Sequence, residues 1–425
     1  MPDPSRQSRS QLTLVFCTVL HTFTHAYGAM LVPLYLLMTA DLHLRGVQYA
    51  ALLVTIYGVS YMACSYGAGV LADRVNRKDL LGWGLVLNAL AIVAMGLTRR
   101  YEVLVALAVA GGLAGTLFHP AANALIPAHF PKSPGMAIGM LGIGSGLGFF
   151  IGPQYAGWRA LHASWHFASV ANWQKPCIEL GAVGVVCGLV FLLIAREAPG
   201  SHGVRSAPKP LGRKLCRTTI AIALTLGARD FSGVASISLV SIYLQKAQNL
   251  DAARAGFIVG MMMLIGVVAN PLAVWISPGR LRLPMLTGVL MLAGVIVSLI
   301  PFVSSIWVLP VLCAYQACQL GSYAMSDAAM LERVPAALRG RIVGLFLTLA
   351  GTAASTSPWI MGFWTDSFGA RASQPRIYLG PFILLGACMW FAVLAMPLIA
   401  KLGEVQEGVI EPMAEILPRT MEAVM

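Results

Sequence analysis

The chain has 425 residues, of which 58% are hydrophobic and only 11% are charged, and its mean hydropathy is +0.76. A soluble protein of this size would carry about a quarter charged residues, so the composition excludes that class and indicates a polytopic membrane protein. The formal net charge of +12 could suggest nucleic-acid binding. However, the basic residues lie in short loops between apolar runs, which membrane orientation explains better, and we predict no nucleic-acid partner.

Twelve apolar runs are long enough to cross a lipid bilayer as helices, which takes about 20 residues each. The first run follows Arg6 and Arg9, is too long for the core of a signal peptide and lacks a clear cleavage site, so we predict a retained first span. The predicted spans are residues 11–38, 47–71, 79–98, 102–128, 135–157, 177–195, 218–244, 253–276, 284–303, 306–330, 340–364 and 377–400.

Basic residues between the spans predict the orientation of the chain in the membrane. Because the number of spans is even, both termini lie on one side, and that side carries 19 Lys and Arg residues against 9 on the other. Basic loops are retained in the cytoplasm. We therefore expect both termini in the cytoplasm of a bacterium, with the protein in its inner membrane.

The longest polar linker, residues 196–217, divides the spans six and six and is rich in Arg, Lys, Pro, Gly and Ser. It predicts an N-terminal bundle at 1–195, a cytoplasmic linker at 196–217, a C-terminal bundle at 218–400 and a cytoplasmic tail at 401–425.

The two predicted bundles repeat one another at a nearly constant offset, which indicates duplication of a six-helix unit. An offset of 205 residues or of 208 residues superimposes several pairs of identical residues: Gly135 and Gly340, Gly139 and Gly344, Pro153 and Pro358, Gly157 and Gly362 at 205; Tyr35 and Tyr243, Gly58 and Gly266 at 208.

The stretch GVLADRVNRK at residues 69–78 ends the second predicted span with a basic exit. A glycine at position 69 permits close approach of another helix. An aspartate can lie against the positive N-terminal end of a neighbouring helix, and arginine and lysine prefer the cytoplasmic face. The residues concerned are Gly69, Asp73, Arg74, Arg77 and Lys78. An ordinary basic loop is the alternative interpretation.

This stretch resembles the G-x-L-a-D-R-x-G-R-K signature of the major facilitator superfamily, between its second and third transmembrane helices. Asn76 stands where that family has glycine, and both residues can adopt a positive φ in a tight turn. The resemblance implies an all-α membrane protein with twelve helices in two pseudo-symmetric six-helix bundles, which rock around a site at mid-membrane. It also implies that residues 69–78 act as a gate rather than as a substrate site.

The fifth predicted span is rich in glycine and contains one internal proline, so it can pack closely and bend. Its spacing is similar to a motif of drug–proton antiporters in the same superfamily, with alanine replacing one glycine, and therefore favours export. Generic helix packing is the alternative. The motif residues are Gly139, Gly148, Gly152, Pro153, Ala156 and Gly157.

Histidines occur deep in the first and fourth predicted spans. His21 and His25 are four residues apart and share one helix face, about 15 Å from the start of the span, close to the midplane. Polar groups at that depth are costly and usually face a cavity. Imidazole gains and loses protons near neutral pH, so these residues could carry a proton or bind an anion. Hydrogen-bonded packing histidines are the alternative.

Three segments together resemble the fosmidomycin-resistance-type branch of the superfamily. They are the first span with its histidines, the Phe118-His119-Pro120 sequence of the fourth span, and the glycine-rich fifth span. That branch often has aspartate where this chain has His25, so an acidic proton carrier is missing there. His21, His25, His119, Tyr27 and Asn123 are predicted substrate contacts.

The seventh predicted span contains Arg229 and Asp230 at a depth similar to His21. An arginine at this place also resembles that branch. Arginine stays charged and needs an anionic or carbonyl partner, so we predict that Arg229 faces the cavity and binds an anionic group. A structural ion pair with Asp230 or Asp327 is the alternative. Asp230, Asp327 and His25 are candidate proton carriers.

Sequence motifs typical of ATP hydrolysis, of cysteine-based metal sites and of enzyme catalysis are absent. The chain has no G-x-x-x-x-G-K-[ST] sequence, no C-x-x-C pair among its 8 cysteines and no catalytic constellation. We therefore predict no enzyme, no cofactor and no metal site.

We predict a monomeric secondary transporter for proton-driven efflux of a small organic molecule, with organic anions among the candidate substrates. Uptake of an organic acid by a proton symporter is the alternative, and a lipid-handling or receptor-like protein is a third hypothesis.

Overall fold

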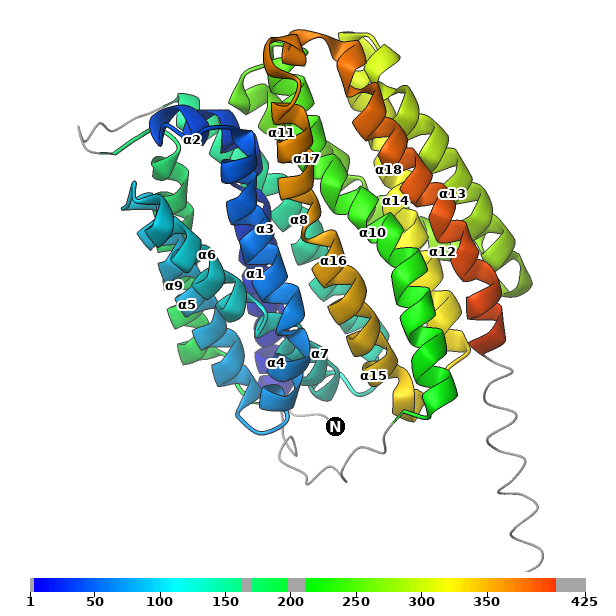
Figure 1. Ribbon diagram of the computed structural model, residues 1–425. Helices are drawn as coiled ribbons and strands as arrows, with labels where there is room; N and C mark the ends of the chain where they lie inside the picture. The colour runs from blue at the N-terminus through cyan, green and yellow to red at the C-terminus, as the bar shows by residue number, and fades with distance from the viewer. Residues whose placement is uncertain (1–3, 163–169, 198–210, 403–425) are drawn as a thin grey trace, which may run out of the picture.

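The computed structural model describes residues 4–162, 170–197 and 211–402, which form helices joined by short turns (Figure 1). The first bundle contains α1 (Pro4–Ala29), η1 (Val32–Leu34), α2 (Tyr35–Asp41), α3 (Val47–Ala63), α4 (Ser65–Ala72), α5 (Arg77–Gly96), α6 (Tyr101–Gly115), α7 (Phe118–His129), α8 (Pro134–Leu161) and α9 (Gln174–Ile194). The second begins with α10 (Arg213–Lys246), α11 (Ala252–Leu264), α12 (Gly266–Ile276), η2 (Gly279–Leu281), α13 (Arg282–Leu299), η3 (Ile300–Phe302) and α14 (Ser305–Glu332). It ends with α15 (Ala336–Phe346), η4 (Leu347–Gly351), α16 (Thr352–Ala354), α17 (Ser357–Asp366), η5 (Gly369–Ser373), η6 (Pro375–Tyr378), α18 (Leu379–Phe391) and η7 (Ala392–Leu394).

Each predicted span corresponds to one helix or to a series of consecutive helices. By length and hydropathy, nine helical segments of the described residues qualify as spans, and the pair α3 and α4, bent by 44°, makes a tenth. The other two are α14 and the series α15–α17. A row of polar residues lowers the hydropathy of α14, and the π-helix η4 divides the series, which explains why neither qualifies by length and hydropathy.

The end of the predicted linker differs from the prediction. Helix α10 starts at Arg213, so residues 213–217 of the predicted linker are helical and lengthen the seventh span by five residues (218 − 213 = 5). Residues 198–210 of that linker and residues 403–425 of the predicted tail lie outside the described residues.

Two helix pairs join the bundles, α8 with α11 and α3 with α17 (Figure 1). Gly157 of α8 packs directly on the backbone of Ala252 and Ala253, and Gly362 of α17 packs on the backbone of Gln48. These contacts are related by the internal repeat, because 362 − 157 and 253 − 48 both equal 205. Glycine is required at both places, since a Cβ atom would collide with the facing backbone.

The same two helix series are packed less closely toward their other ends, although α4 still contacts α15 there. A Cβ atom built on Gly139 of α8 or on Gly344 of α15 would meet no atom of the described residues within 4 Å. These glycines are again repeat-related (344 − 139 = 205). The bundles are therefore packed together at the end that holds Gly157 and Gly362.

Asp366, the last residue of α17, reinforces this closed end. Its carboxylate accepts hydrogen bonds from the backbone N–H groups of Val47 (3.0 Å) and Gln48 (2.8 Å) at the start of α3. The Nζ atom of Lys246 lies 3.6 Å from the same carboxylate. A carboxylate at a helix N-terminus satisfies unpaired N–H donors and complements the helix dipole.

We expect Gly157→Leu to open the closed end. The added side chain overpacks the α8–α11 contact, at a cost of about 1–3 kcal/mol to this conformation. The distance between spin labels on the ends of α3 and α17 near Asp366 should therefore shift to longer values in a cysteine-free background. Gly139→Leu, in the same helix but facing open space, is the matched control, and an unchanged distance in Gly157→Leu would contradict the packing argument.

Candidate functional site

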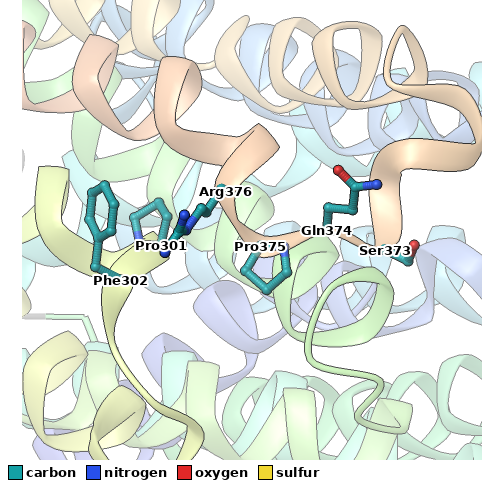
Figure 2. Close-up of a pocket in the computed structure, with 6 residues that line it drawn as sticks. All are labelled: Pro301, Phe302, Ser373, Gln374, Pro375 and Arg376. Atoms are coloured by element: carbon teal, nitrogen blue, oxygen red, sulfur yellow. The ribbon is translucent and has the colours of Figure 1, made fainter.

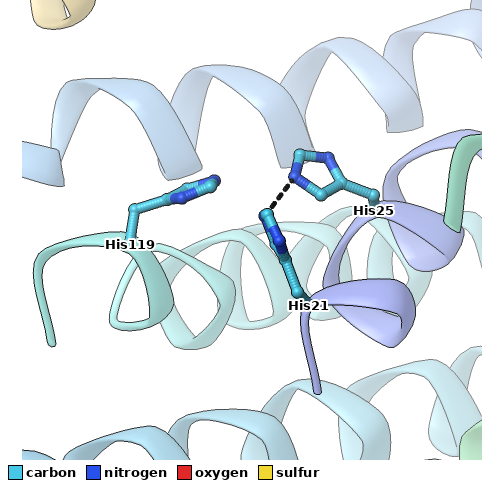
Figure 3. A group of neighbouring side chains, drawn as sticks. All are labelled: His21, His25 and His119. Carbon is cyan, nitrogen blue, oxygen red and sulfur yellow. Dashed lines mark hydrogen bonds between the residues drawn. The ribbon is translucent and has the colours of Figure 1, made fainter. Parts of the chain in front are cut away.

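His21, His25 and His119 form a cluster inside the first bundle, which we call the histidine cluster (Figure 3). The first two come from α1 and the third from the start of α7, and their rings point toward one another. The Nε2 atoms of His21 and His25 are 3.0 Å apart, and the ring centroid of His119 lies 5.0 Å from that of His21. The sequence placed the α1 pair on one face, and the fold adds the third histidine.

Hydrogen bonds assign the tautomers of the α1 pair. The Nδ1 atom of His21 is 2.7 Å from the carbonyl oxygen of Leu141, so it must carry the proton and donate. In the neutral ring Nε2 of His21 is then an acceptor, and Nε2 of His25 donates to it. A chain of two hydrogen bonds therefore runs from His25 through His21 to the backbone of α8.

The glycines of α8 make this arrangement possible. Gly144 and Gly148 lie against the backbone and Cβ atoms of α1 at His21 and His25, and Gly152 lies against Ala26 one turn further on. The close approach brings the Leu141 carbonyl within reach of His21. One side of α8 thus packs on α1 through the glycines of the antiporter-like motif. The other side packs on α11 through Pro153 and Gly157.

Aromatic rings enclose the histidine cluster. Phe118 stacks on His21 with ring centroids 4.7 Å apart, and Phe149 lies 4.6 Å from His25. Tyr61 of α3 meets His119 edge-on at 6.1 Å. Such contacts hold imidazole rings in fixed orientations.

The second bundle contains a polar cluster around Arg229, whose side chain is fully buried. Its Nε and Nη2 atoms lie 2.9 Å and 2.8 Å from Oδ1 of Asp230. Nη1 donates to the hydroxyl of Ser326 (2.7 Å) and to the carbonyl of Ser322 (3.1 Å), and the guanidinium lies 3.9 Å from the ring centroid of Tyr323.

Arg229 and Asp230 are adjacent in sequence and form an ion pair. Adjacent residues diverge by about 100° on a helix, but a long, flexible arginine side chain can fold back along the helix and reach its neighbour. The structural ion pair left open by the sequence is therefore present, and α14 supplies the remaining acceptors.

The two clusters occupy repeat-related positions. His21 and Arg229 differ by 208 residues, as do His119 and Asp327 (327 − 119 = 208). The contact partners follow the same rule, because His21 stacks on Phe118 and Arg229 bonds Ser326 (326 − 118 = 208). Both bundles therefore place a basic side chain of their first span against their fourth span.

Asp327 follows Ser326 in α14 and is exposed, whereas Asp230 is buried. A carboxylate facing lipid at this depth is costly, so we expect Asp327 to face water between the bundles. The two candidate acids thus differ in access to solvent.

Two predicted substrate contacts differ in their surroundings. Tyr27 is buried, and its hydroxyl donates to the carbonyl of Leu180 in α9 at 3.0 Å, so it packs α1 on α9 and does not face the histidine cluster's centre. Its predicted role as a substrate contact stays a prediction. Asn123 is exposed one turn after His119, and its role stays a prediction.

The stretch 69–78 spans the turn from α4 to α5. Gly69 lies near Pro120 of α7, Asp73 and Arg74 are exposed, and Arg77 is buried. The backbone N–H of Lys78 donates to Glu197 at 3.0 Å, which ties the turn to the end of α9.

Asn76 does not use the positive φ that glycine and asparagine can both adopt in a tight turn. Its φ is −61°, and its side chain caps α5 by accepting from the N–H of Asp79 at 3.0 Å. Asparagine replaces glycine here as a helix cap, which is one of its preferred roles.

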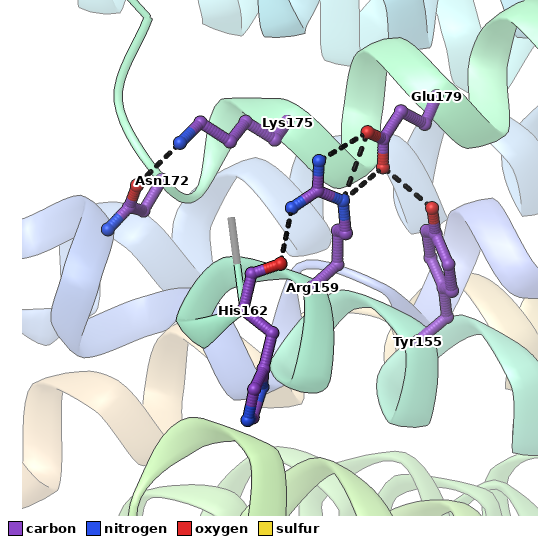
Figure 4. Close-up of polar contacts among 6 residues, drawn as sticks. All are labelled: Tyr155, Arg159, His162, Asn172, Lys175 and Glu179. Atoms are coloured by element: carbon purple, nitrogen blue, oxygen red, sulfur yellow. Dashed lines mark hydrogen bonds and ion pairs between the residues drawn. The ribbon is translucent and has the colours of Figure 1, made fainter. Parts of the chain in front are cut away.

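Other polar features lie at the closed end, away from both clusters. In Figure 4, Arg159 of α8 pairs with Glu179 of α9 (2.7 Å), which also accepts from Tyr155 (2.6 Å), while Lys175 donates to Asn172. Glu179 of α9 is thus held by two side chains of α8. A pocket between η3 and η5–η6 is lined by Pro301, Phe302, Ser373, Gln374, Pro375 and Arg376 (Figure 2).

Sequence reasoning missed the contacts of Arg229 in α14, which are Ser322, Tyr323 and Ser326. Gln316, Gln319, Tyr323 and Asp327 recur at intervals of three or four residues and place a polar stripe on one face of α14. That spacing was a usable signal. The pairing of α10 with this stripe, in contrast, depends on tertiary contacts.

We expect the double variant Arg229→Gln/Asp230→Asn to be more stable than either single variant. Removing one member of a buried pair leaves an uncompensated charge and costs about 3–5 kcal/mol, whereas neutralising both removes that penalty. Thermal unfolding of each purified variant in detergent measures the order of their stabilities. If the loss of stability in the double variant equalled the sum of the losses in the two single variants, the pairing would be contradicted.

Comparisons with known proteins agree with this architecture. The family model described as Major Facilitator Superfamily matches residues 14–358. Multidrug resistance protein MdtH of Shigella dysenteriae is 21% identical over 339 residues, covering 77% of this chain and 79% of that protein. Quinolone resistance protein NorA of Staphylococcus aureus is 23% identical over 169 residues, covering 40% of this chain and 41% of that protein.

Solved structures share the fold. A bacterial homologue of the human lysosomal transporter Spinster, inward-facing and unoccupied, has a TM-score of 0.74 at 17% identity, covering 95% of this chain and 98% of that chain. A mutant of the nucleoside transporter NupG has a TM-score of 0.68 at 14% identity, covering 90% and 99%. The predicted fold and superfamily are confirmed. This chain belongs to the major facilitator superfamily and is an integral membrane transporter rather than an enzyme.

Proposed function

We propose that this transporter exports a small organic molecule in exchange for protons, acting as a monomer in a bacterial inner membrane with both termini in the cytoplasm. The observation that carries the proposal is the polar cluster of the second bundle. It combines a permanent positive charge at Arg229, a buried carboxylate at Asp230 and an exposed carboxylate at Asp327. The drug-resistance names of the relatives support the outward direction.

Exchange requires that the proton and the substrate exclude one another. Asp327 suits this role because an exposed carboxylate can bind either a proton or a cationic or hydrogen-bond-donating group of the substrate, but not both. An anionic group of the same substrate would be drawn to Arg229. A substrate with both a donor and an acidic group therefore fits the cluster, and His21, His25 and His119 offer further polar contacts from the facing bundle.

One observation favours a second candidate, proton-coupled uptake. If a substrate anion displaces Asp230 from Arg229, the released buried carboxylate must bind a proton to avoid an unpaired charge. Anion and proton would then move together, which is symport. The Arg229–Asp230 pair supports uptake of an organic acid, whereas Asp327 supports exchange.

The closed end assigns the conformation once the orientation is fixed. With the termini in the cytoplasm, the α8–α11 and α3–α17 contacts would close the outer side, and the cytoplasmic side would be the more loosely packed one. The stretch 69–78 lies on that side. Exposed Asp73 and Arg74 then belong to a gate that engages when the cytoplasmic side closes.

We expect Asp327→Asn to abolish proton-driven efflux while leaving substrate exchange intact. An efflux-deficient bacterium expressing wild type should survive one class in a panel of phosphonate antibiotics, toxic organic acids and amphipathic drugs, and a protonophore should remove the protection. Cells with Asp327→Asn should be as sensitive as cells without the transporter. In proteoliposomes the variant should still exchange labelled for unlabelled substrate, because that reaction needs no net proton movement and the asparagine amide oxygen can still accept a hydrogen bond from a donor group of the substrate.

Glu102→Gln, which neutralises an exposed acid at the other end of the membrane, is the matched control and should protect like wild type. If wild type instead sensitises the cells, and Asp230→Asn removes that effect while Asp327→Asn does not, the uptake candidate replaces export.

A further inference from the structure

We propose that the histidine cluster binds one divalent transition-metal ion of the class of Zn²⁺, Co²⁺ or Ni²⁺. His21, His25 and His119 each offer one ring nitrogen, and these atoms all lie within 4.8 Å of one another. Neutral imidazole is a preferred ligand of these ions. The proposal replaces the sequence prediction of no metal site, which considered cysteine spacing and contiguous motifs and could not connect α1 with α7.

The α1 pair already has the spacing of two metal ligands. Histidines at i and i+4 lie on one helix face, the arrangement used by helical zinc sites. Two nitrogens bound to one tetrahedral ion at 2.0–2.1 Å are about 3.3 Å apart. The Nε2 atoms of His21 and His25 are 3.0 Å apart. A small rotation of either ring therefore makes room for an ion between them.

The second contact of His21 supports the same assignment. Metal-bound histidine usually donates its other ring N–H to a carbonyl or carboxylate, which fixes the ring and raises its basicity. The Nδ1–H group of His21 donates to the Leu141 carbonyl at 2.7 Å, so Nε2 is the unprotonated atom and points at the other rings (Figure 3). The packing of Gly144 on α1 holds this carbonyl in place.

Binding needs only a tautomer change in His25. Its Nε2–H now donates to His21, and the proton must move to Nδ1 before Nε2 can bind the ion. No net proton is released by that step. The ring of His119, for which the described residues show no hydrogen-bond partner, would break no hydrogen bond when its nitrogen binds the ion as the third ligand.

Three neutral ligands leave the charge of the ion uncompensated and its coordination incomplete. The fourth position would take an anion, as open three-histidine zinc sites take hydroxide or substrate. The loaded cluster would carry positive charge at the position related to Arg229 by the 208-residue repeat. An acidic substrate could then be held from both bundles, a consequence that rests on the proposed function, whereas binding of the ion does not.

The test is direct binding to the purified full chain, prepared without a polyhistidine tag and treated with a chelator. Titration with Co²⁺ should produce the absorption bands of a low-symmetry cobalt site at one ion per chain, and Zn²⁺ should displace them. His25→Gln and His119→Gln should each weaken binding at least about tenfold. His162→Gln, which changes an exposed histidine outside the cluster, should bind like wild type.

The measurement does not involve transport, so its failure is separate from failure of the proposed function. Melting temperatures identify a variant that does not fold. His119→Gln breaks no hydrogen bond seen in the described residues, so it carries the comparison if His25→Gln is unfolded. Absence of one-to-one binding by wild type at millimolar ion, or equal binding by the folded His119→Gln variant, would overturn the proposal.

Discussion

The close packing of α8 against two neighbours is the contact on which the rest of the structure depends. Its glycines let α1 approach from one side and α11 from the other. Helix α8 therefore packs within the first bundle and also forms the contact with the second bundle. The same packing places the Leu141 carbonyl beside His21. A side chain on the side of α8 that faces α1 would disrupt the histidine cluster. A side chain on the side that faces α11 would disrupt the contact between the bundles.

Duplication explains why the two bundles can rock as similar bodies. The glycine contacts at the closed end recur at an offset of 205 residues, and the polar clusters recur at 208. The chemistry has diverged within this frame. A titratable imidazole occupies the position in the first bundle where the second has a permanently charged guanidinium, and His119 is matched by Asp327. The architecture is symmetric, but the ligand would meet different charges on its two sides.

Burial separates the roles available to the charged residues. Arg229 and Asp230 satisfy one another in a dry environment, which makes the pair costly to break by removal of one member. Asp327, in contrast, is exposed and can exchange protons with water. Under the proposed function, a substrate would either compete at the exposed acid or displace the buried one, and these two routes would couple protons in opposite directions.

The sequence by itself determined the membrane class, the positions of the spans, the internal repeat and the depth of the histidines and of Arg229. Hydropathy and helical spacing are local properties, so they can be read from neighbouring residues. Only the tertiary structure brought His119 to the α1 pair, folded Arg229 back on Asp230 and placed Tyr27 against α9. It also showed Asn76 as a helix cap and Asp366 as a bridge between bundles. These contacts join residues far apart in sequence or depend on side-chain rotamers, and no periodicity along the chain encodes them.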